Sequence, residues 1–251
     1  MPRRSARLRA DQGQGRADRG RPGLTLRPAP AAVVLDFDGL IVDTETPIFE
    51  AWLAAYRRRG QPLGLEEWQH ALGTHGGFDP LEHLDALLGG TLDREAVLAE
   101  VKEATAAGCE GRPLLPGVLP LLRDARALGL GRAVASSSSC GWVDGWLRRH
   151  GIRELLDVVV ARDDVRKVKP DPELFLLAAS RLGVDPASCV VFEDSPNGMR
   201  AALAAGMRCV AVPNALTRPL ARPAVDLVLE SLAERPLAGI VEALATAPAR
   251  A

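Results

Sequence analysis

Acidic, basic and hydroxyl side chains stand at the ends of apolar runs or beside the start of a helical pattern, in a combination that could bind a metal ion and a phosphate group. The set consists of Asp36, Asp38, Ser136, Ser137, Lys169, Glu193 and Asp194. Gly39 follows the second aspartate and lets the backbone turn, so that this carboxylate can swing over a site. Lys169 is one of only three lysines in a chain dominated by arginine. Carboxylates, an ammonium group and hydroxyls are what a phosphate-transfer site requires.

The elements that must position these side chains alternate between strand and helix. Strand-like apolar runs occupy residues 33–37, 133–135, 157–161, 189–192 and 208–212, with a weaker one at 226–229. Helical patterns occupy residues 142–150, 172–182 and 197–205. The runs are short and apolar throughout, which is typical of buried parallel strands. We therefore predict an α/β protein with a Rossmann-like, doubly wound parallel sheet.

Residues 47–113 differ from the rest because their apolar spacing is helical and no strand-like run interrupts it. Phe49, Trp52, Leu53 and Tyr56 fall on one helix face. A second stripe consists of Leu81, Leu84, Leu87 and Leu88. We predict a core domain of residues 32–46 and 114–246, with a helical domain of residues 47–113 inserted after the first strand. Residues 1–31, rich in Arg, Gly, Ala and Pro, are predicted to form a disordered arm.

The carboxyl ends of parallel strands meet at one edge of a sheet, where ligands bind in open α/β folds. Three or four carboxylates gathered there would repel one another unless a cation lies among them. Oxygen ligands favour a hard divalent cation, for which we predict Mg²⁺. With Mg²⁺, the ammonium of Lys169 and the hydroxyls of Ser136 and Ser137 would surround a bound phosphate group.

The amino-acid composition limits the classes of binding partner that are expected. The formal net charge is −1, from 31 Lys and Arg against 32 Asp and Glu, so neither nucleic acid nor an anionic membrane is expected as a partner. The four cysteines include no CxxC pair and are expected to be buried and reduced. No apolar stretch is long enough to cross a bilayer. We expect a soluble cytoplasmic monomer that acts on a small-molecule phosphate ester.

The four motifs resemble those of the haloacid dehalogenase superfamily, in the branch of β-phosphoglucomutase and many small-molecule phosphatases. Residues 36–45 resemble the first motif, Ser136 the second, Lys169 the third, and Glu193-Asp194-Ser195 with Gly198 the fourth. The matches occur in family order and span residues 32–245. Each alone would also fit ordinary structure, as a turn, a loop or a helix cap, but four in order at strand ends are specific.

The resemblance implies a two-step reaction. Asp36 would attack phosphorus and form an aspartyl-phosphate, while Asp38 protonates the leaving alcohol and later activates the hydrolytic water. Mg²⁺ would be held by Asp36, the backbone carbonyl of Asp38, and Asp194, with Glu193 as a direct ligand or as support. Lys169 would assist catalysis and bind the phosphate. The helical domain would be a mobile cap that closes over the substrate.

Three other activities fit these residues less well. The dehalogenases that name the superfamily lack the second aspartate of the first motif, so Asp38 disfavours carbon–halogen chemistry. Phosphohexomutases share the core residues, but they carry a histidine and an arginine where this chain has Ile48 and Gly76. After the second motif they have lysine and asparagine, whereas this chain has Ser139 and Cys140. A non-catalytic phosphate-binding module is disfavoured because mere binding needs no proton carrier.

The predicted function is hydrolysis of a small phosphorylated metabolite, a sugar phosphate or a similar phosphomonoester. Residues 73–78 form a glycine-rich connection in the helical domain, which fits either a specificity element or an ordinary helix connection. We predict that Glu45, Thr74, His75 and Phe78 read the substrate.

Overall fold

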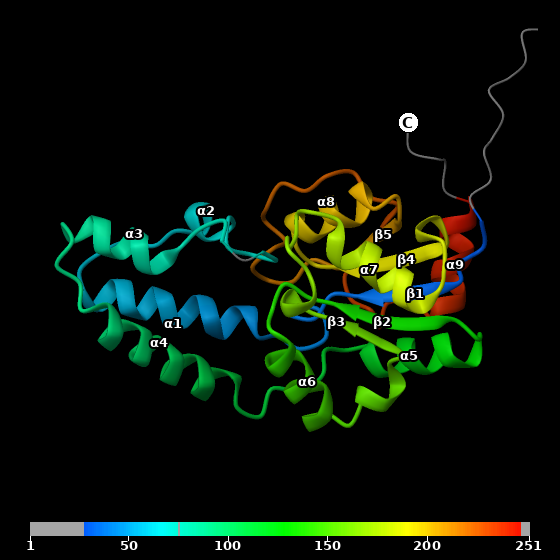
Figure 1. The fold of residues 1–251 in the computed structure, drawn as a ribbon, viewed down its shortest axis with the longest axis horizontal. Coiled ribbons are helices and arrows are strands. Elements are labelled where there is room, and N and C mark those ends of the chain that lie inside the picture. Colours follow the sequence, from blue (N-terminus) through cyan, green and yellow to red (C-terminus); the bar gives the residue numbers. More distant parts are fainter. Residues whose placement is uncertain (1–27, 75, 247–251) are drawn as a thin grey trace, which may run out of the picture.

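The protein is built around a parallel sheet, seen in a computed structural model that describes residues 28–74 and 76–246 (Figure 1). Within these residues the sheet has six strands in the order β3-β2-β1-β4-β5-β6, and every neighbouring pair is parallel. The strands are β1 (Ala32–Leu35), β2 (Gly131–Ala135), β3 (Val158–Val160), β4 (Cys189–Glu193), β5 (Arg208–Ala211) and β6 (Leu227–Val228). The order places β1, the strand nearest the amino terminus, in the interior of the sheet.

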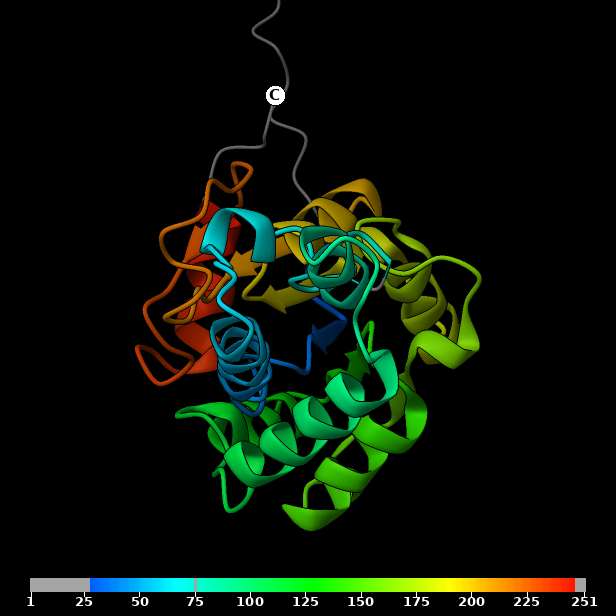
Figure 2. The same ribbon diagram turned by 90° about the vertical axis from the view of Figure 1, so that its left-hand side faces the viewer.

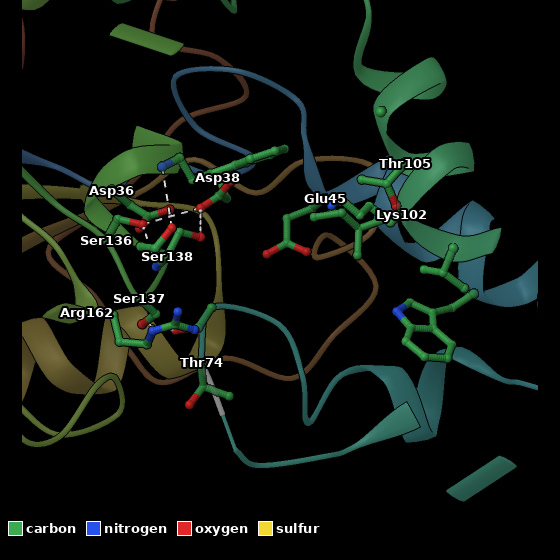
Figure 3. Close-up of a pocket in the computed structure, with 17 residues that line it drawn as sticks. Asp36, Asp38, Glu45, Thr74, Lys102, Thr105, Ser136, Ser137, Ser138 and Arg162 are labelled. Carbon is green, nitrogen blue, oxygen red and sulfur yellow. Dashed lines mark hydrogen bonds between the residues drawn. The ribbon is translucent and has the colours of Figure 1, made fainter. Parts of the chain in front are cut away.

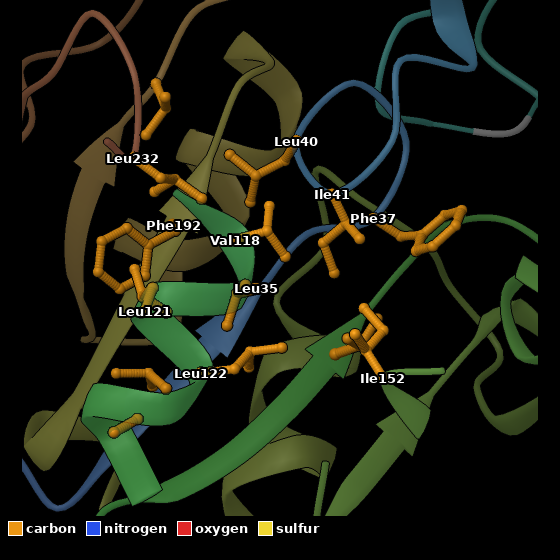
Figure 4. Packing of buried hydrophobic residues seen from close by; sticks show 14 of the residues in the cluster. Leu35, Phe37, Leu40, Ile41, Val118, Leu121, Leu122, Ile152, Phe192 and Leu232 are labelled. Carbon is orange, nitrogen blue, oxygen red and sulfur yellow. The ribbon is translucent and has the colours of Figure 1, made fainter. Parts of the chain in front are cut away.

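Helices cover both faces of the sheet, because alternate residues of each strand point to opposite sides and both sides are apolar. In β1, Val33 and Leu35 belong to one buried cluster, whereas Ala32 and Val34 belong to another. The first cluster includes residues of α5 (Val118–Ala127), α6 (Cys140–Arg149) and α9 (Leu237–Thr246). Figure 4 shows Val118 and Leu122 of α5 near Leu35 of β1. The second cluster packs against α7 (Glu173–Leu182) and α8 (Pro196–Ala204). Three single turns complete the core: η1 (Arg153–Leu155), η2 (Arg162–Asp164) and η3 (Pro186–Ser188).

Four of the five described helices between β1 and β2 form what we call the helical insert, residues 45–109. They are α1 (Glu45–Arg58), α2 (Leu65–Trp68), α3 (Pro80–Leu87) and α4 (Arg94–Cys109). The insert has its own buried cluster, which includes Trp52, Tyr56, Leu84 and Val97. Figures 1 and 2 show the insert beyond the carboxyl ends of the strands, facing the edge of the sheet.

The sequence prediction of a doubly wound parallel sheet is confirmed, and its strand-like runs correspond to the six strands. The helical pattern of the insert is also present, although α1 begins at Glu45, two residues before the predicted limit of 47. The assignment of residues 32–46 with 114–246 and of residues 47–113 to two domains stays a prediction. The predicted arm, residues 1–31, lies outside the described residues except at its end.

Two predictions about single side chains were wrong. Leu87, predicted to lie in an apolar stripe, is 43% exposed, because a residue six positions after Leu81 points away from the covered face of α3. Cys140 is exposed at the start of α6, whereas Cys109, Cys189 and Cys209 are buried as expected, and all four are free thiols. Among the described helices, none is both long and apolar enough to cross a bilayer.

Two leucines of the α5 region test the core assignment. Leu122 is fully buried under the sheet and Leu128 is 52% exposed. We expect Leu122→Ala to lower the free energy of unfolding by about 2–5 kcal/mol, because it removes buried methyl groups and leaves a cavity. Leu128→Ala should change it by less than about 0.5 kcal/mol. Chemical denaturation measures both, and equal losses would contradict the packing described above.

Candidate active site

The ends of three adjacent strands define the candidate active site. β1 lies between β2 and β4, with Leu35 in register with Val134 on one side and Phe192 on the other. The backbone N–H of Asp36 donates to the carbonyl of Phe192 at 3.0 Å. The residues that follow the three strands therefore lie at the same edge of the sheet. Glu193, the last residue of β4, lies there as well.

Lys169 brings a positive charge to this edge from the chain that precedes α7. Its side chain is fully buried, and its Nζ donates to Oδ1 of Asp36 and, at 2.7 Å, to Oε1 of Glu193. Burial lowers the pKa of Lys169, but the charges of Asp36 and Glu193 raise it by more, so its pKa lies above the ordinary value. The side chain is therefore a permanent cation between two acids.

Glu193 is engaged by protein donors on both of its carboxylate oxygens. While Oε1 accepts from Lys169, Oε2 accepts from the backbone N–H of Ser195 at 2.8 Å and from its hydroxyl at 3.0 Å. Gly198 packs so closely that a Cβ there would lie 1.6 Å from Oε1 of Glu193. The glycine of the fourth motif thus makes room for this carboxylate, which in turn holds Lys169.

Three buried acids form the cluster that could hold a metal ion. Asp36, Glu193 and Asp194 each offer a ligand atom, and these atoms lie within 4.8 Å of one another. Burial, opposed by Lys169 and reinforced by Glu193, raises the pKa of Asp36 to about 7. Burial, followed by the charges of Glu193 and Asp36, raises the pKa of Asp194 well above its usual range. One lysine does not neutralise three carboxylates, so the donor set fits a hard divalent cation.

Asp194 is oriented by a residue that follows β5. The amide Nδ2 of Asn214 donates to Oδ2 of Asp194 at 2.7 Å and to the carbonyl of Gly39 at 3.3 Å. Gly39 has a φ of +82°, and a Cβ there would lie 2.6 Å from the Asn214 amide and 2.7 Å from Oδ2 of Asp194. Only glycine fits this turn, both because of its backbone conformation and because of the close approach.

The carboxylate of Asp38 is surrounded by four donors. Its Oδ1 accepts from the hydroxyl of Thr44 at 2.6 Å and from the indole N–H of Trp142 at 2.8 Å. Its Oδ2 accepts from the hydroxyls of Ser138 at 2.6 Å and Ser136 at 3.3 Å. Figure 3 shows Asp36, Asp38, Ser136 and Ser138 side by side at one end of the pocket. The second aspartate of the first motif is therefore held in one orientation at the site.

A pocket of about 500 Å³ opens from these residues toward the helical insert. Its wall includes Glu45 from α1, Lys102 and Thr105 from α4, and Arg162 from η2. In Figure 3 the side chain of Arg162 lies beside Ser137. Burial, followed by the charges of Asp38 and Asp36, raises the pKa of the half-buried Glu45. The reacting end of the pocket is thus acidic, while its wall carries cations and hydroxyl groups.

The connection between α2 and α3 touches the core beside the acids. The hydroxyl of Ser137 donates to the carbonyl of Gly73 at 3.0 Å, and the amide of Asn197 donates to the carbonyl of Leu72 at 3.0 Å. Thr74, the next residue, lines the pocket. The glycine-rich connection therefore helps to close one side of the pocket.

The other residues predicted to read the substrate lie in different places. Glu45, like Thr74, lines the pocket. Phe78 instead packs in the insert, with its ring 5.2 Å from that of His83, and is not among the lining residues. His75 lies outside the described residues.

The structure brings together the seven core residues singled out from the sequence, and it adds others that the sequence did not single out for the site. The additional side chains are Thr44, Lys102, Trp142, Ser138, Arg162 and Asn214. Ser138 belongs to the serine run and Thr44 to the first motif, so both carried a local signal. Trp142 and Asn214 carried none, because a tryptophan in a helix and an asparagine after a strand are ordinary on their own.

Several known proteins resemble this chain in sequence. The haloacid dehalogenase-like hydrolase family matches residues 30–206. "Putative phosphatase YhcW" of Bacillus subtilis (strain 168) is 44% identical over 213 residues, which make up 85% of this chain and 97% of that protein. Fructose-1-phosphate phosphatase YqaB of Escherichia coli (strain K12) is 36% identical over 186 residues, 72% of this chain and 96% of its relative.

A solved structure resembles the chain in both sequence and fold. CbbY from Rhodobacter sphaeroides, crystallised in complex with phosphate, has a TM-score of 0.65 and 31% identity, over 82% of this chain and 96% of that one. The family match spans more than half of this chain, and the two relatives, both named as phosphatases, resemble it over nearly their full length. The chain belongs to the haloacid dehalogenase-like hydrolases, and within that family it is a phosphoric monoester hydrolase.

Proposed function

We propose that the protein is a Mg²⁺-dependent phosphatase that hydrolyses a small phosphorylated metabolite through an aspartyl-phosphate on Asp36. The observation that carries this proposal is the position of Asp36. Its carboxylate is bonded to Lys169, lies within the cluster of three acids, and lines the pocket. A nucleophile placed between two cationic sites would meet a phosphoryl group whose negative charge is already compensated.

We assign Mg²⁺ to Asp36, Asp194 and the backbone carbonyl of Asp38. When bound, the ion would neutralise charge on the phosphoryl oxygens. Asn214 orients Asp194 through its amide and leaves Oδ1 of that residue for the ion. Because both oxygens of Glu193 already accept hydrogen bonds from Lys169 and Ser195, we assign to Glu193 the support of Lys169.

The chemistry of the chain's own residues follows in two steps. A carboxylate oxygen of Asp36 forms a bond to phosphorus while the bond to the leaving alcohol breaks, and the carboxyl of Asp38 gives that alcohol its proton. In the second step Asp38 takes a proton from water, whose oxygen attacks phosphorus and releases Asp36 and inorganic phosphate. Lys169 with the hydroxyls of Ser136 and Ser137 would hold the phosphoryl oxygens.

The helical insert is proposed to act as the cap of this site. It supplies Glu45, Thr74, Lys102 and Thr105 to the pocket wall, so that its position decides how the pocket opens. A wall of ammonium, guanidinium, carboxylate and hydroxyl groups suits a substrate with several hydroxyl groups, which supports a sugar phosphate or a similar phosphomonoester. The name of the relative YqaB, a fructose-1-phosphate phosphatase, supports the same substrate class.

Hydrolysis is favoured over transfer to a second hydroxyl of the substrate. Where the mutases carry a histidine on the first cap helix, this chain has Ile48, and Ile48 lines the pocket. An aliphatic side chain there offers no proton to a sugar hydroxyl. The solved β-phosphoglucomutase of Clostridium difficile resembles the chain at 23% identity, which shows a shared fold alone.

The role of Asp36 is tested by Asp36→Asn. The carboxamide keeps the size of the side chain but is a poor nucleophile, so turnover of phosphate monoesters should fall by at least about a thousandfold. A panel of phosphorylated sugars with Mg²⁺, followed by release of inorganic phosphate, measures the loss. Asp144→Asn, which alters a surface ion pair with Arg148, is the matched control and should keep full activity. Equal rates for the wild type and Asp36→Asn would reject this assignment.

The metal assignment predicts that Mg²⁺ raises the thermal midpoint of the wild type and that Asp194→Asn abolishes this rise. The reason is that binding to the native state alone stabilises it, and the variant loses one ligand. Asp144→Asn should retain the rise. Differential scanning calorimetry with EDTA and with Mg²⁺ measures the shift, and a rise of the same size in Asp194→Asn would place the ion elsewhere.

The stabilisation by Mg²⁺ should also depend on pH. Asp36 has a pKa near 7 in the folded protein and 3.8 as the ordinary value, so the metal-free native state binds more protons than the unfolded state between these values. Metal-free stability should therefore fall as pH rises from about 4 to about 7. Protons compete with Mg²⁺ for the same oxygens, so the Mg²⁺-induced rise in thermal midpoint should be larger at pH 8 than at pH 6. A rise that does not change with pH would contradict the raised pKa of Asp36.

A further inference from the structure

Trp142, in the first turn of α6, directs its indole N–H at the candidate proton carrier. Its Nε1 donates to Oδ1 of Asp38 at 2.8 Å, across 104 positions of the sequence. The side chain is half-buried and lines the pocket. The N-cap of α6 is Ser139, whose hydroxyl accepts from the backbone N–H of Trp142. The serine run that follows β2 therefore also fixes the position of the first turn of α6, which carries Trp142.

The indole differs in kind from the other three donors on Asp38. Thr44, Ser136 and Ser138 donate through hydroxyl groups, which can rotate and can also accept hydrogen bonds. An indole N–H only donates, and its direction is fixed by the plane of the ring. When substrate competes for the hydroxyls, the contact with Trp142 is the one that cannot turn away unless the ring moves.

The ring of Trp142 is held by its neighbours on α6. Trp146 contacts it edge to face, with centroids 5.8 Å apart and an interplanar angle of 71°. Trp146 itself stacks on His150 at 5.7 Å and lies under the guanidinium of Arg149 at 4.7 Å. Trp142, Trp146 and His150 are spaced four apart on one side of the helix, so they form a column that restrains the indole.

Trp142 also stands where the insert meets the core. It lines the active-site pocket and a second cavity of about 290 Å³, and Ala106 of α4 lines both of them. The ring therefore lies next to α4 on one side and Asp38 on the other. The side chain also packs against the buried cluster of the core, so it combines an apolar contact with the hydrogen bond to Asp38.

We propose that Trp142 is a positioning residue that orients the carboxyl of Asp38 for proton transfer to the leaving alcohol. The inference rests on the proposed phosphatase function and extends it to a residue outside the four motifs. Trp142 acts through Asp38 and forms no bond with the reacting atoms. Its removal should therefore harm the steps that need a proton from Asp38 and spare those that do not.

The test compares two leaving groups in Trp142→Phe, which keeps an aromatic ring and removes the N–H. Glycerol 2-phosphate releases an alkoxide that must be protonated, whereas p-nitrophenyl phosphate releases a stable phenolate. The ratio kcat/KM reports the steps up to loss of the leaving group. We expect kcat/KM for glycerol 2-phosphate to fall about tenfold and that for p-nitrophenyl phosphate to change less than about twofold. Trp68→Phe is the matched control and should change neither, because Trp68 lies in the buried cluster of the insert and its indole N–H has no hydrogen-bond partner among the described residues.

A second measurement follows the contact without relying on turnover. The chain has four tryptophans, so the indole N–H signals in a ¹H–¹⁵N spectrum are few. The signal of Trp142 is identified by Phe variants of the tryptophans. Bonded to a carboxylate, its proton should resonate downfield, and in Asp38→Ala it should move upfield by more than the signals of Trp52, Trp68 and Trp146.

The outcomes separate the possibilities. An equal fall for both substrates in Trp142→Phe would mean a structural role, and no fall for either would mean no role; both overturn the inference. An indole signal that does not respond to Asp38→Ala would overturn it as well, even if Trp142→Phe does not fold. A wild-type protein that hydrolyses neither phosphate with Mg²⁺ would instead reject the proposed function, while the indole signal would still decide whether Trp142 binds Asp38.

Discussion

The structure depends on an electrostatic constraint at the end of β1 and β4. Three buried carboxylates lie within 4.8 Å of one another, and one lysine is bonded to two of them. Buried charges are tolerated only when they are paired and hydrogen-bonded. Lys169 supplies one positive charge, and burial together with the neighbouring acids raises the pKa of Asp36 and of Asp194. This excess of buried carboxylates favours the binding of a divalent cation and, beside the cation, of the anionic oxygens of a phosphate group.

The sheet and the apolar layers on its two faces hold these acids in place. β1 lies between β2 and β4 and is covered by an apolar layer on each face. This packing fixes the positions of Asp36, Ser136 and Glu193 at the carboxyl ends of the three strands. Gly39 and Gly198 admit the close approaches that side chains would block. The helical insert supplies part of the pocket wall, so the acids lie on the core while Glu45, Thr74, Lys102 and Thr105 come from a separate element.

The sequence predicted the sheet and the grouping of the motif residues because both depend on short-range patterns. Apolar runs mark buried strands, and polar residues at their ends must meet wherever the strands are parallel. It did not single out α5 or α9, whose helical faces were not recognised between the strands. Nor did it single out Trp142 or Asn214 for the site. Their roles arise from contacts across 104 and 20 positions, and no local pattern specifies a tertiary hydrogen bond.

The measurement that tests the central claim most directly is the position of a bound divalent cation. In crystals grown with Mn²⁺, which prefers oxygen ligands as Mg²⁺ does and scatters anomalously, the account predicts one strong anomalous peak between the carboxylates of Asp36 and Asp194. The ammonium of Lys169 should remain on the opposite side of Asp36. An anomalous map without a peak there at saturating Mn²⁺, or with Mn²⁺ bound only elsewhere, would contradict the claim that these acids are gathered around a cation.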